Sequence, residues 1–206
     1  WSSRDGATWL LAWSNEPADP RLLAPLRRDG EVALGVPGYL GDPGQADRLL
    51  RSDDPGAAAD ELPGVFGVFR ADQRGFDAIT TAVRIHPVYY ATAGDVTIAG
   101  NRALLVHVAA RAVERLPGDR ADVRYDVPAL QAFVRSGYFV SDDTPFAGVR
   151  ALPPHSTLRA RAGALEITTR ALPTAATAPD GGSRRALLGD LVDSLAETVS
   201  PLRAFT

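Results

Sequence analysis

Histidines, paired acids and a glycine-rich stretch are the residues of this 206-residue chain whose types and spacing could do chemistry. The three histidines, His86, His107 and His155, lie in unlike sequence contexts and form no His-x-x-x-His pair, so the sequence does not indicate a zinc site. Each is therefore interpreted as a surface or hydrogen-bonded histidine. A Gly-x-Ser-x-Gly turn is also missing, so the sequence does not indicate the nucleophilic serine of an α/β-hydrolase.

The acidic pairs Asp53–Asp54 and Asp142–Asp143 could hold a divalent cation or act as acid and base. Both pairs lie near Pro in segments typical of solvated turns, so we interpret them as turns. The glycines at positions 35, 38, 41 and 44 resemble a phosphate-binding loop, but Pro37 and Pro43 remove two of the backbone donors that such a loop needs. The sequence therefore predicts no catalytic, cofactor-binding or metal-binding residue.

Composition excludes further mechanisms. Lys and Arg total 22 and all are Arg, which removes a Lys nucleophile, a Lys Schiff base and the phosphate loop ending in Gly-Lys-Ser/Thr. The absence of Cys removes thiolate catalysis, disulfides and Cys-bound metals. At a net charge of -3, neither nucleic acid nor a membrane surface is an expected partner. Because no segment has the length of an apolar membrane span, we expect a cytoplasmic protein.

Short segments rich in β-branched and aromatic residues predict the strands that must position any site. They are Trp9–Trp13, Glu31–Gly35, Val65–Arg70, Ala78–Arg84, Val88–Ala91 and Val96–Ala99. Asp72–Gly75 and Thr92–Asp95 have the length and the glycine of hairpin turns, so the predicted sheet is largely antiparallel.

Helical spacing of apolar residues predicts three longer helices. Asn101–Arg111 is expected to bury Leu104, Leu105 and Val108. Val127–Ser136, capped by Asp126, is expected to bury Leu130, Phe133 and Val134. A last helix, from Ser183 to Pro201, carries an apolar stripe that must pack on the domain or on another chain, made of Leu187, Leu188, Leu191, Leu195 and Val199. Residues 35–44 and 52–56 are predicted to form turns rich in Pro and Gly, and between them only 45–51 is expected to be helical.

These elements divide the chain into a domain over residues 1–172, a linker over 173–183 and the first helix of a second unit over 184–206. The linker is rich in Pro, Thr, Ala and Gly and lacks apolar periodicity. Because position 1 is Trp and the chain contains no Met, we expect that residues precede Trp1 in the natural protein.

Several stretches carry a family resemblance in fixed order. Leu62–Phe69 reads LPGVFGVF and precedes the turn Asp72–Gly75, Ile85–Ala91 reads IHPVYYA, Ile98–His107 reads IAGNRALLVH, and Gly148–His155 reads GVRALPPH. Together with the helix and loop of 127–146, they resemble the N-terminal glutaminase-type domain of the asparagine synthetase B-like family, a class II glutamine amidotransferase domain. The resemblance covers residues 61–170 and implies an α+β fold, the Ntn-hydrolase-like αββα sandwich of antiparallel sheets flanked by helices.

The chain departs from this family at the residues that carry glutamine chemistry. The nucleophilic Cys is absent, and residues 34–40, where the family has its Asn-Gly-Glu-Ile-Tyr-Asn glutamine loop, read LGVPGYL. Ala57–Asp60 replaces the family's Asp-Thr-Glu. Ile79–Arg84 replaces its Ala-Arg-Asp-x-x-Gly. A glutamine pocket between residues 34–40 and 80–85 is therefore expected to be collapsed or filled.

The resemblance thus implies a catalytically silent, degenerate glutaminase-like domain. Lasso peptide cyclases and β-lactam synthetases are family members of this kind: they form amides with a substrate amine in place of ammonia. The expected partners are a C-terminal synthetase domain or chain, which would bind ATP and Mg, and a peptide or small-molecule substrate. Two alternatives stay open. One is an active hydrolase or amidotransferase whose nucleophile is Ser2 or Ser3 after processing, and the other is a non-catalytic module that binds a peptide or carrier protein.

Overall fold

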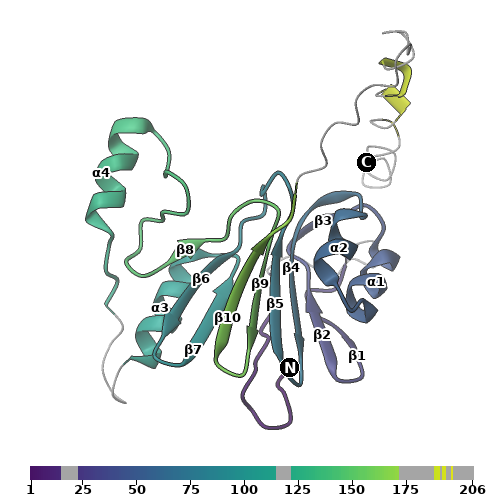
Figure 1. Ribbon diagram of the computed structural model, residues 1–206, viewed down its shortest axis with the longest axis horizontal. Helices are drawn as coiled ribbons and strands as arrows, with labels where there is room; N and C mark the ends of the chain where they lie inside the picture. The colour runs from purple at the N-terminus through teal and green to yellow at the C-terminus, as the bar shows by residue number, and fades with distance from the viewer. Residues whose placement is uncertain (15–22, 115–121, 172–187, 191, 194–195, 197–206) are drawn as a thin grey trace.

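The computed structural model of the chain describes residues 1–14, 23–114, 122–171, 188–190, 192–193 and 196 (Figure 1). Its helices are α1 (Ala46–Arg51), α2 (Pro55–Asp60), α3 (Ala103–Val113) and α4 (Val127–Ser136), with a 3-10 turn at Pro43–Gln45. Its strands are β1 (Arg27–Asp29), β2 (Val32–Gly35), β3 (Gly38–Leu40), β4 (Gly64–Asp72), β5 (Gly75–Thr80), β6 (Tyr89–Ala93), β7 (Val96–Gly100), β8 (Arg150–Ala151), β9 (Ser156–Arg161) and β10 (Ala164–Thr169).

Two antiparallel sheets organise these elements. The larger sheet has seven strands in the order β1-β2-β4-β5-β9-β10, with β3 paired to one end of β4. The smaller sheet has the order β7-β6-β8. Four of the pairings are hairpins, β1–β2, β4–β5, β6–β7 and β9–β10, so most contacts within the sheets are local in sequence.

The two sheets pack face to face through a buried apolar core. Strand alternation turns Ala78 of β5 and Leu158 of β9 toward the smaller sheet, where they contact Val88 and Leu152. All four side chains are fully buried. This core therefore joins the sheets along β5 and β9 rather than across the whole width of the larger sheet.

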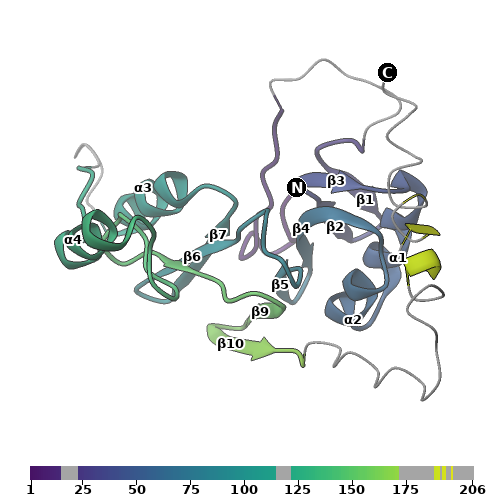
Figure 2. The ribbon, with the colours of Figure 1, turned by 90° about the horizontal axis from the view of Figure 1, so that it is seen from above.

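Helices cover the outer faces of both sheets. On the larger sheet, the outward side chains of β2, β4 and β5 pack with Leu49 and Leu50 of α1 and Ala59 of α2. On the smaller sheet, Ala91 and Ala93 of β6 pack against Val106 and Ala110 of α3. Figure 2 shows the resulting succession of α3, the smaller sheet, the larger sheet, and α1 with α2.

Local sequence explains where α2 and α4 begin. Asp54 accepts hydrogen bonds from the backbone N–H groups of Gly56 and Ala57, and Pro55 follows in the first turn of α2. Asp126 caps α4 in the same way through Ala129 N–H, and Gly137 ends that helix in the left-handed conformation with φ 78. Helix α4 stands away from the two sheets (Figure 1).

The prediction of an α+β protein with antiparallel sheets is confirmed. The hairpins at 72–75 and 92–95 and the Asp126 cap are confirmed as well. Among the described residues, no helix is long and apolar enough to cross a membrane.

Other expectations about the elements are wrong. Trp9–Trp13 forms only an isolated bridge, between Trp9 and Ser2, because no strand pairs along its length. Strand β5 ends at Thr80, and residues 81–84 turn away from the sheet. Helix α2 and the β9–β10 hairpin were not predicted: Pro55-Gly56 was assigned to a turn, whereas it forms the first turn of a capped helix.

The expected buried faces of two helices are also wrong. In α3 the buried side chains include Val106 and His107, whereas Leu104 and Leu105 are exposed. In α4 Phe133 and Val134 are exposed, because this helix packs on neither sheet. The linker at 173–183 and most of the last apolar stripe lie outside the described residues, although Leu188 is described and is exposed.

The core between the sheets predicts a clear difference between two leucines. Leu158→Ala removes a fully buried side chain from this core and should lower the free energy of unfolding by about 2 to 5 kcal/mol. Leu165→Ala, on the neighbouring edge strand, truncates a side chain that is 37% exposed and should cost less than about 1 kcal/mol. Urea unfolding followed by circular dichroism measures both, and equal losses would contradict the described core.

Candidate functional site

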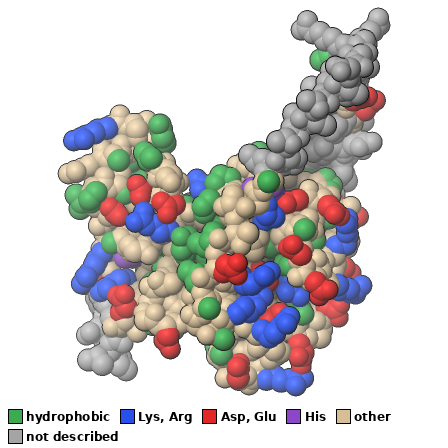
Figure 3. Space-filling view, in the orientation of Figure 1, with side chains coloured by type: hydrophobic (Ala, Val, Ile, Leu, Met, Phe, Trp, Pro, Cys, Tyr) green, Lys and Arg blue, Asp and Glu red, His purple; other side chains and the backbone are tan. Residues whose placement is uncertain are grey.

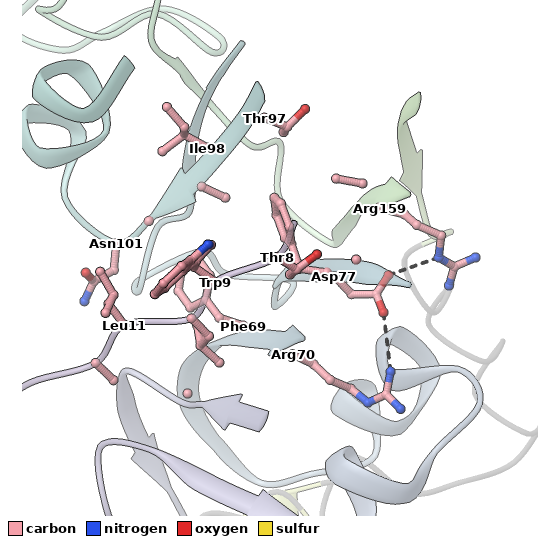
Figure 4. Close-up of a pocket in the computed structure, with 18 of the residues that line it drawn as sticks. Thr8, Trp9, Leu11, Phe69, Arg70, Asp77, Thr97, Ile98, Asn101 and Arg159 are labelled. Atoms are coloured by element: carbon pink, nitrogen blue, oxygen red, sulfur yellow. Dashed lines mark hydrogen bonds and ion pairs between the residues drawn. The ribbon is translucent and has the colours of Figure 1, made fainter. Parts of the chain in front are cut away.

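A long groove opens between the two sheets, with a volume of about 2400 Å³. We call it the inter-sheet groove. Its floor includes Phe69 and Phe76 of the larger sheet, and one wall is formed by residues 95–102, which include β7. The opposite wall is formed by the N-terminal residues 7–14 and the loop at 35–40. Figure 4 shows Trp9 and Leu11 on this side, near Phe69, with Thr97 and Ile98 across from them.

The groove exists because the smaller sheet is narrower than the larger one. Strand β7 is its last strand, and among the described residues no further strand pairs with it. The N-terminal residues cross this end of the groove in extended form, but Trp9, Leu11 and Trp13 remain 65%, 75% and 72% exposed. The groove is thus open at this end and apolar there, while Arg70, Asp77 and other charged residues line the rest of it.

The loop expected at a glutamine site forms part of the groove wall. Its backbone is held by β3, which pairs with β4, and by the hydrogen bond from Gly67 N–H to Pro37 O. Gly38 has φ 107, and a Cβ added there would lie 2.6 Å from Cδ2 of His86. Glycine is therefore required where His86 packs against the loop. No side chain of residues 34–40 is ionised at neutral pH, so the loop offers no charged partner to the head group of an amino acid.

The structure does not join this loop to residues 80–85 in one pocket. None of these six residues lines the groove. Arg84, with φ 46, donates instead to the carbonyl of Leu152 at 3.1 Å. Residues 35–40 border the open inter-sheet groove instead, and the collapse of a glutamine pocket between the two segments stays a prediction.

His107 and His155 are hydrogen-bonded inside the protein, as predicted. His107 Nδ1 faces the carbonyl of Ala147 at 3.0 Å and its Nε2 accepts from Arg124 N–H at 2.9 Å, so His107 carries its proton on Nδ1. This one imidazole thereby holds both ends of residues 124–147, a segment that includes α4 and that we call the arm.

His155 belongs to a polar network that joins α2 to the end of β10. Its Nε2 lies 2.9 Å from the Asp60 carboxylate and its Nδ1 lies 3.0 Å from Arg170 O. Arg170 donates to both carboxylate oxygens of Asp60, at 2.8 and 3.1 Å, and also to Thr80 O and Thr157. Because both ring nitrogens of His155 face acceptors, these contacts are complete when both nitrogens carry protons. No local pattern in the sequence indicates that Asp60 and Arg170 are partners, because they are 110 residues apart.

His86 differs from the other two histidines because it is only partly buried, where it packs against the loop at 35–40. Burial lowers its pKa below the ordinary 6.5, and the positive charge of Arg102 lowers it further. His86 is therefore held neutral near pH 7.

A second charged cluster lies on the larger sheet, and its residues Arg70, Asp77 and Arg159 are among those that line the inter-sheet groove (Figure 4). Asp77 is 1% exposed and accepts from Arg159 Nε at 3.0 Å and Arg161 Nη2 at 2.7 Å, and Arg70 Nη1 lies 3.7 Å away. The hydrogen bond and the charge of Asp77 raise the pKa of Arg159. These residues share one face because Arg70, Asp77 and Arg159 are register partners on adjacent strands (Figure 4). Acidic and basic side chains are intermingled on the face of the molecule that Figure 3 shows. In the sequence, only the alternation of these charged residues with apolar residues along each strand indicates that they share a face.

The acidic pairs lie in turns and at a helix start, away from one another. Asp54 caps α2, whereas Asp143 is 2.8 Å and Asp142 is 3.5 Å from Arg150. Within the described ranges, no group of three His, Cys, Asp or Glu side chains could hold a metal ion. Ser3, a candidate nucleophile, is buried, and its hydroxyl donates to Asp5 at 2.5 Å and accepts from Thr8 N–H at 2.9 Å. Ser2 is exposed in the bridge to Trp9.

Comparison with known proteins adds no assignment: the sequence matches no protein-family model, and no curated protein matches it.

The environment of His86 predicts its titration. In NMR-monitored titration its midpoint should lie below 6.5, so the unfolded state binds the proton more readily and stability falls as the pH drops below 6.5. Arg102→Gln should raise the midpoint while leaving it below 6.5, because burial is the larger cause. Arg28→Gln, in strand β1, should leave it unchanged, and a wild-type midpoint at or above 6.5 would contradict the described packing.

The network around Asp60 predicts a loss of stability on neutralisation. Asp60→Asn leaves the largely buried Arg170 guanidinium and the His155 ring without their shared carboxylate, so the free energy of unfolding should fall by about 2 kcal/mol. Asp29→Asn breaks an exposed ion pair with Arg51 and should cost only about 0.5 kcal/mol. Thermal and urea unfolding of both variants give the comparison, and equal small effects would show that the network does not stabilise the fold.

Proposed function

We propose that this chain is a glutaminase-like domain that does not use glutamine, within an ATP-dependent amide-forming enzyme of the asparagine synthetase B-like type. The fold supports this proposal. Helix, sheet, sheet and helix follow one another in the order of the αββα sandwich of Ntn-type hydrolases. The stretches that carry the resemblance form β4 of the larger sheet, β6 and β7 of the smaller sheet with α3, and β8 with the turn before β9.

One observation carries the proposed loss of glutamine chemistry. The loop at residues 34–40 lies on the wall of the inter-sheet groove but provides no ionised side chain. A bound amino acid needs partners for its ammonium and its carboxylate, and each unpaired charge in a partly buried site costs about 1 to 3 kcal/mol or more. Arg84 is not available as such a partner because it donates to the Leu152 carbonyl.

In the proposed enzyme, ammonia is not required because the attacking amine belongs to the substrate. A synthetase domain outside the described residues would bind ATP with Mg, transfer AMP to a substrate carboxylate and release pyrophosphate. The substrate amine would then attack the acyl carbon, lose a proton, form the amide bond and release AMP. The glutaminase-like domain would support that domain without a catalytic residue of its own, in the cytoplasm.

The alternative of an active hydrolase finds less support. Such an enzyme needs a Ser or Thr whose hydroxyl lies beside a free α-amine or another base. Ser3 is instead enclosed by Asp5 and Thr8, and the α-amino group of Trp1 donates to Leu10 O at 3.2 Å.

Glutamine assays test the proposal directly. The purified chain should release no ammonia from glutamine above the buffer blank, and calorimetry should detect no heat of glutamine binding up to millimolar concentrations. Ser3→Ala should behave as the wild type does. Ammonia release that Ser3→Ala abolishes would establish the hydrolase instead.

The parent protein provides a second, independent test. With a substrate that carries both an amine and a carboxylate, it should convert ATP to AMP and pyrophosphate in the absence of glutamine. A natural sequence that continues past Thr206 without a Ser/Thr-Gly-Gly-x-Asp-Ser pyrophosphate loop would refute the assignment.

A further inference from the structure

The outer edge of β7 faces the inter-sheet groove with unpaired backbone groups. Strand β7 pairs with β6 through a hairpin whose two turn residues are Gly94 and Asp95, so Ala93 and Val96 form its first hydrogen-bonded pair. Hydrogen-bonded and non-hydrogen-bonded pairs then alternate. The N–H and C=O groups of Thr97 and Ala99 therefore point away from β6 and along the groove.

The groove surrounds this edge with apolar surface suited to one extended chain. Phe69 and Phe76 form the floor, and Leu105 of α3, 45% exposed, lines the same wall as β7. A strand paired with β7 would alternate its side chains between the floor and the side of α3. Both directions offer apolar contacts.

The walls also decide what kind of partner fits. The larger sheet lies beneath the edge of β7, and the N-terminal residues 7–14 stand opposite. The edge strand of a second folded domain could reach β7 only if the layer behind it overlapped the larger sheet. A single extended peptide needs no such layer, so it fits where a second copy of this chain does not.

The charged residues at the two ends of β7 determine the orientation in which a peptide would lie along this strand. Asp95 precedes the strand and Arg102 follows it, and both line the groove. Neither side chain forms an ion pair with another described residue. Five residues of strand span about 17 Å. A matching peptide therefore carries a carboxylate at one end and a cation five to six residues away.

We propose that the inter-sheet groove binds an extended peptide in trans, as an added strand antiparallel to β7. Antiparallel pairing is the more stable arrangement, and it places the first residues of the peptide near Arg102 and its last residues near Asp95. The preferred peptide is thus acidic at its start, apolar or β-branched along its middle and basic at its end. This binding activity does not depend on the proposed amide-forming function.

Synthetic peptides test the proposal. The probe is acetyl-Glu-Val-Thr-Val-Thr-Val-Lys-amide, and its binding is followed by calorimetry and by the fluorescence of Trp9 and Trp13, which line the groove. Saturable binding is expected. A peptide with Glu and Lys exchanged should bind about tenfold more weakly, because both end contacts become repulsive. A peptide with Pro in place of both Thr residues should show no binding, because it lacks those N–H donors and cannot adopt the paired strand.

Two matched protein variants locate the site. Thr97→Pro removes an N–H group that points into the groove while leaving the β6–β7 hydrogen bonds in place, so binding should be lost with the thermal unfolding midpoint nearly unchanged. Ile167→Pro makes the same change on the free edge of β10 and should leave binding intact. Arg102→Gln should weaken binding several-fold.

Three results would overturn the proposal. The first is no binding of the acidic-start peptide at about 1 mM. The second is equal binding by the Pro-containing peptide, a control that does not depend on the folding of any variant. The third is a wild-type dimer that Thr97→Pro dissociates, which would assign the edge to a second copy.

Discussion

The contact between the two sheets is the constraint on which the rest of the structure depends. Ala78 and Leu158 meet Val88 and Leu152 without exposure to solvent, and this core is the layer that both sheets share. It lies along β5 and β9, so strands farther along the larger sheet have no counterpart above them. The open inter-sheet groove follows from this placement, because the smaller sheet ends at β7 before the larger sheet does. One apolar contact therefore determines both the stability of the sandwich and the position of its binding surface.

Two clusters of charged side chains connect neighbouring elements at the borders of this core. The Asp60 network ties α2 to the end of β10, and the Asp77 cluster ties β4, β5 and β9 together on the larger sheet. The buried Asp77 has several cationic partners, which offset the cost of removing its charge from water, and the more exposed Asp60 is likewise shared by Arg170 and His155. The Asp60 network does not line the inter-sheet groove and we interpret it as structural, whereas the Asp77 cluster lines the groove with its charges paired to one another.

How far the sequence predicted this structure depended on whether the signal was local. Hairpins with a glycine turn, and the Asp126 cap, are encoded within a few residues, and they were predicted at the right places. The exposed face of α4 was not predicted, because amphipathic spacing shows that a helix has an apolar side but not whether a partner covers it. The contacts among Asp60, His155 and Arg170 join distant segments, so no spacing in the chain could reveal them. The groove likewise follows from the relative widths of two sheets, which no single motif encodes.

The arm has a consequence for how this protein opens. Its base is closed by His107, which binds Ala147 O and Arg124 N–H, and by the bridge between Tyr125 and Phe146. Beyond that base, α4 contributes only Ala129 to the buried interior. The arm also contacts residues 149–151 through Asp142, Asp143 and Thr144. Breaking these contacts together with those at the base would release the arm while the main strands of both sheets stayed paired, so the arm is a separate cooperative unit. The amide protons of the arm should accordingly exchange with solvent through local opening, whereas those of β5 and β9 should exchange only through global unfolding.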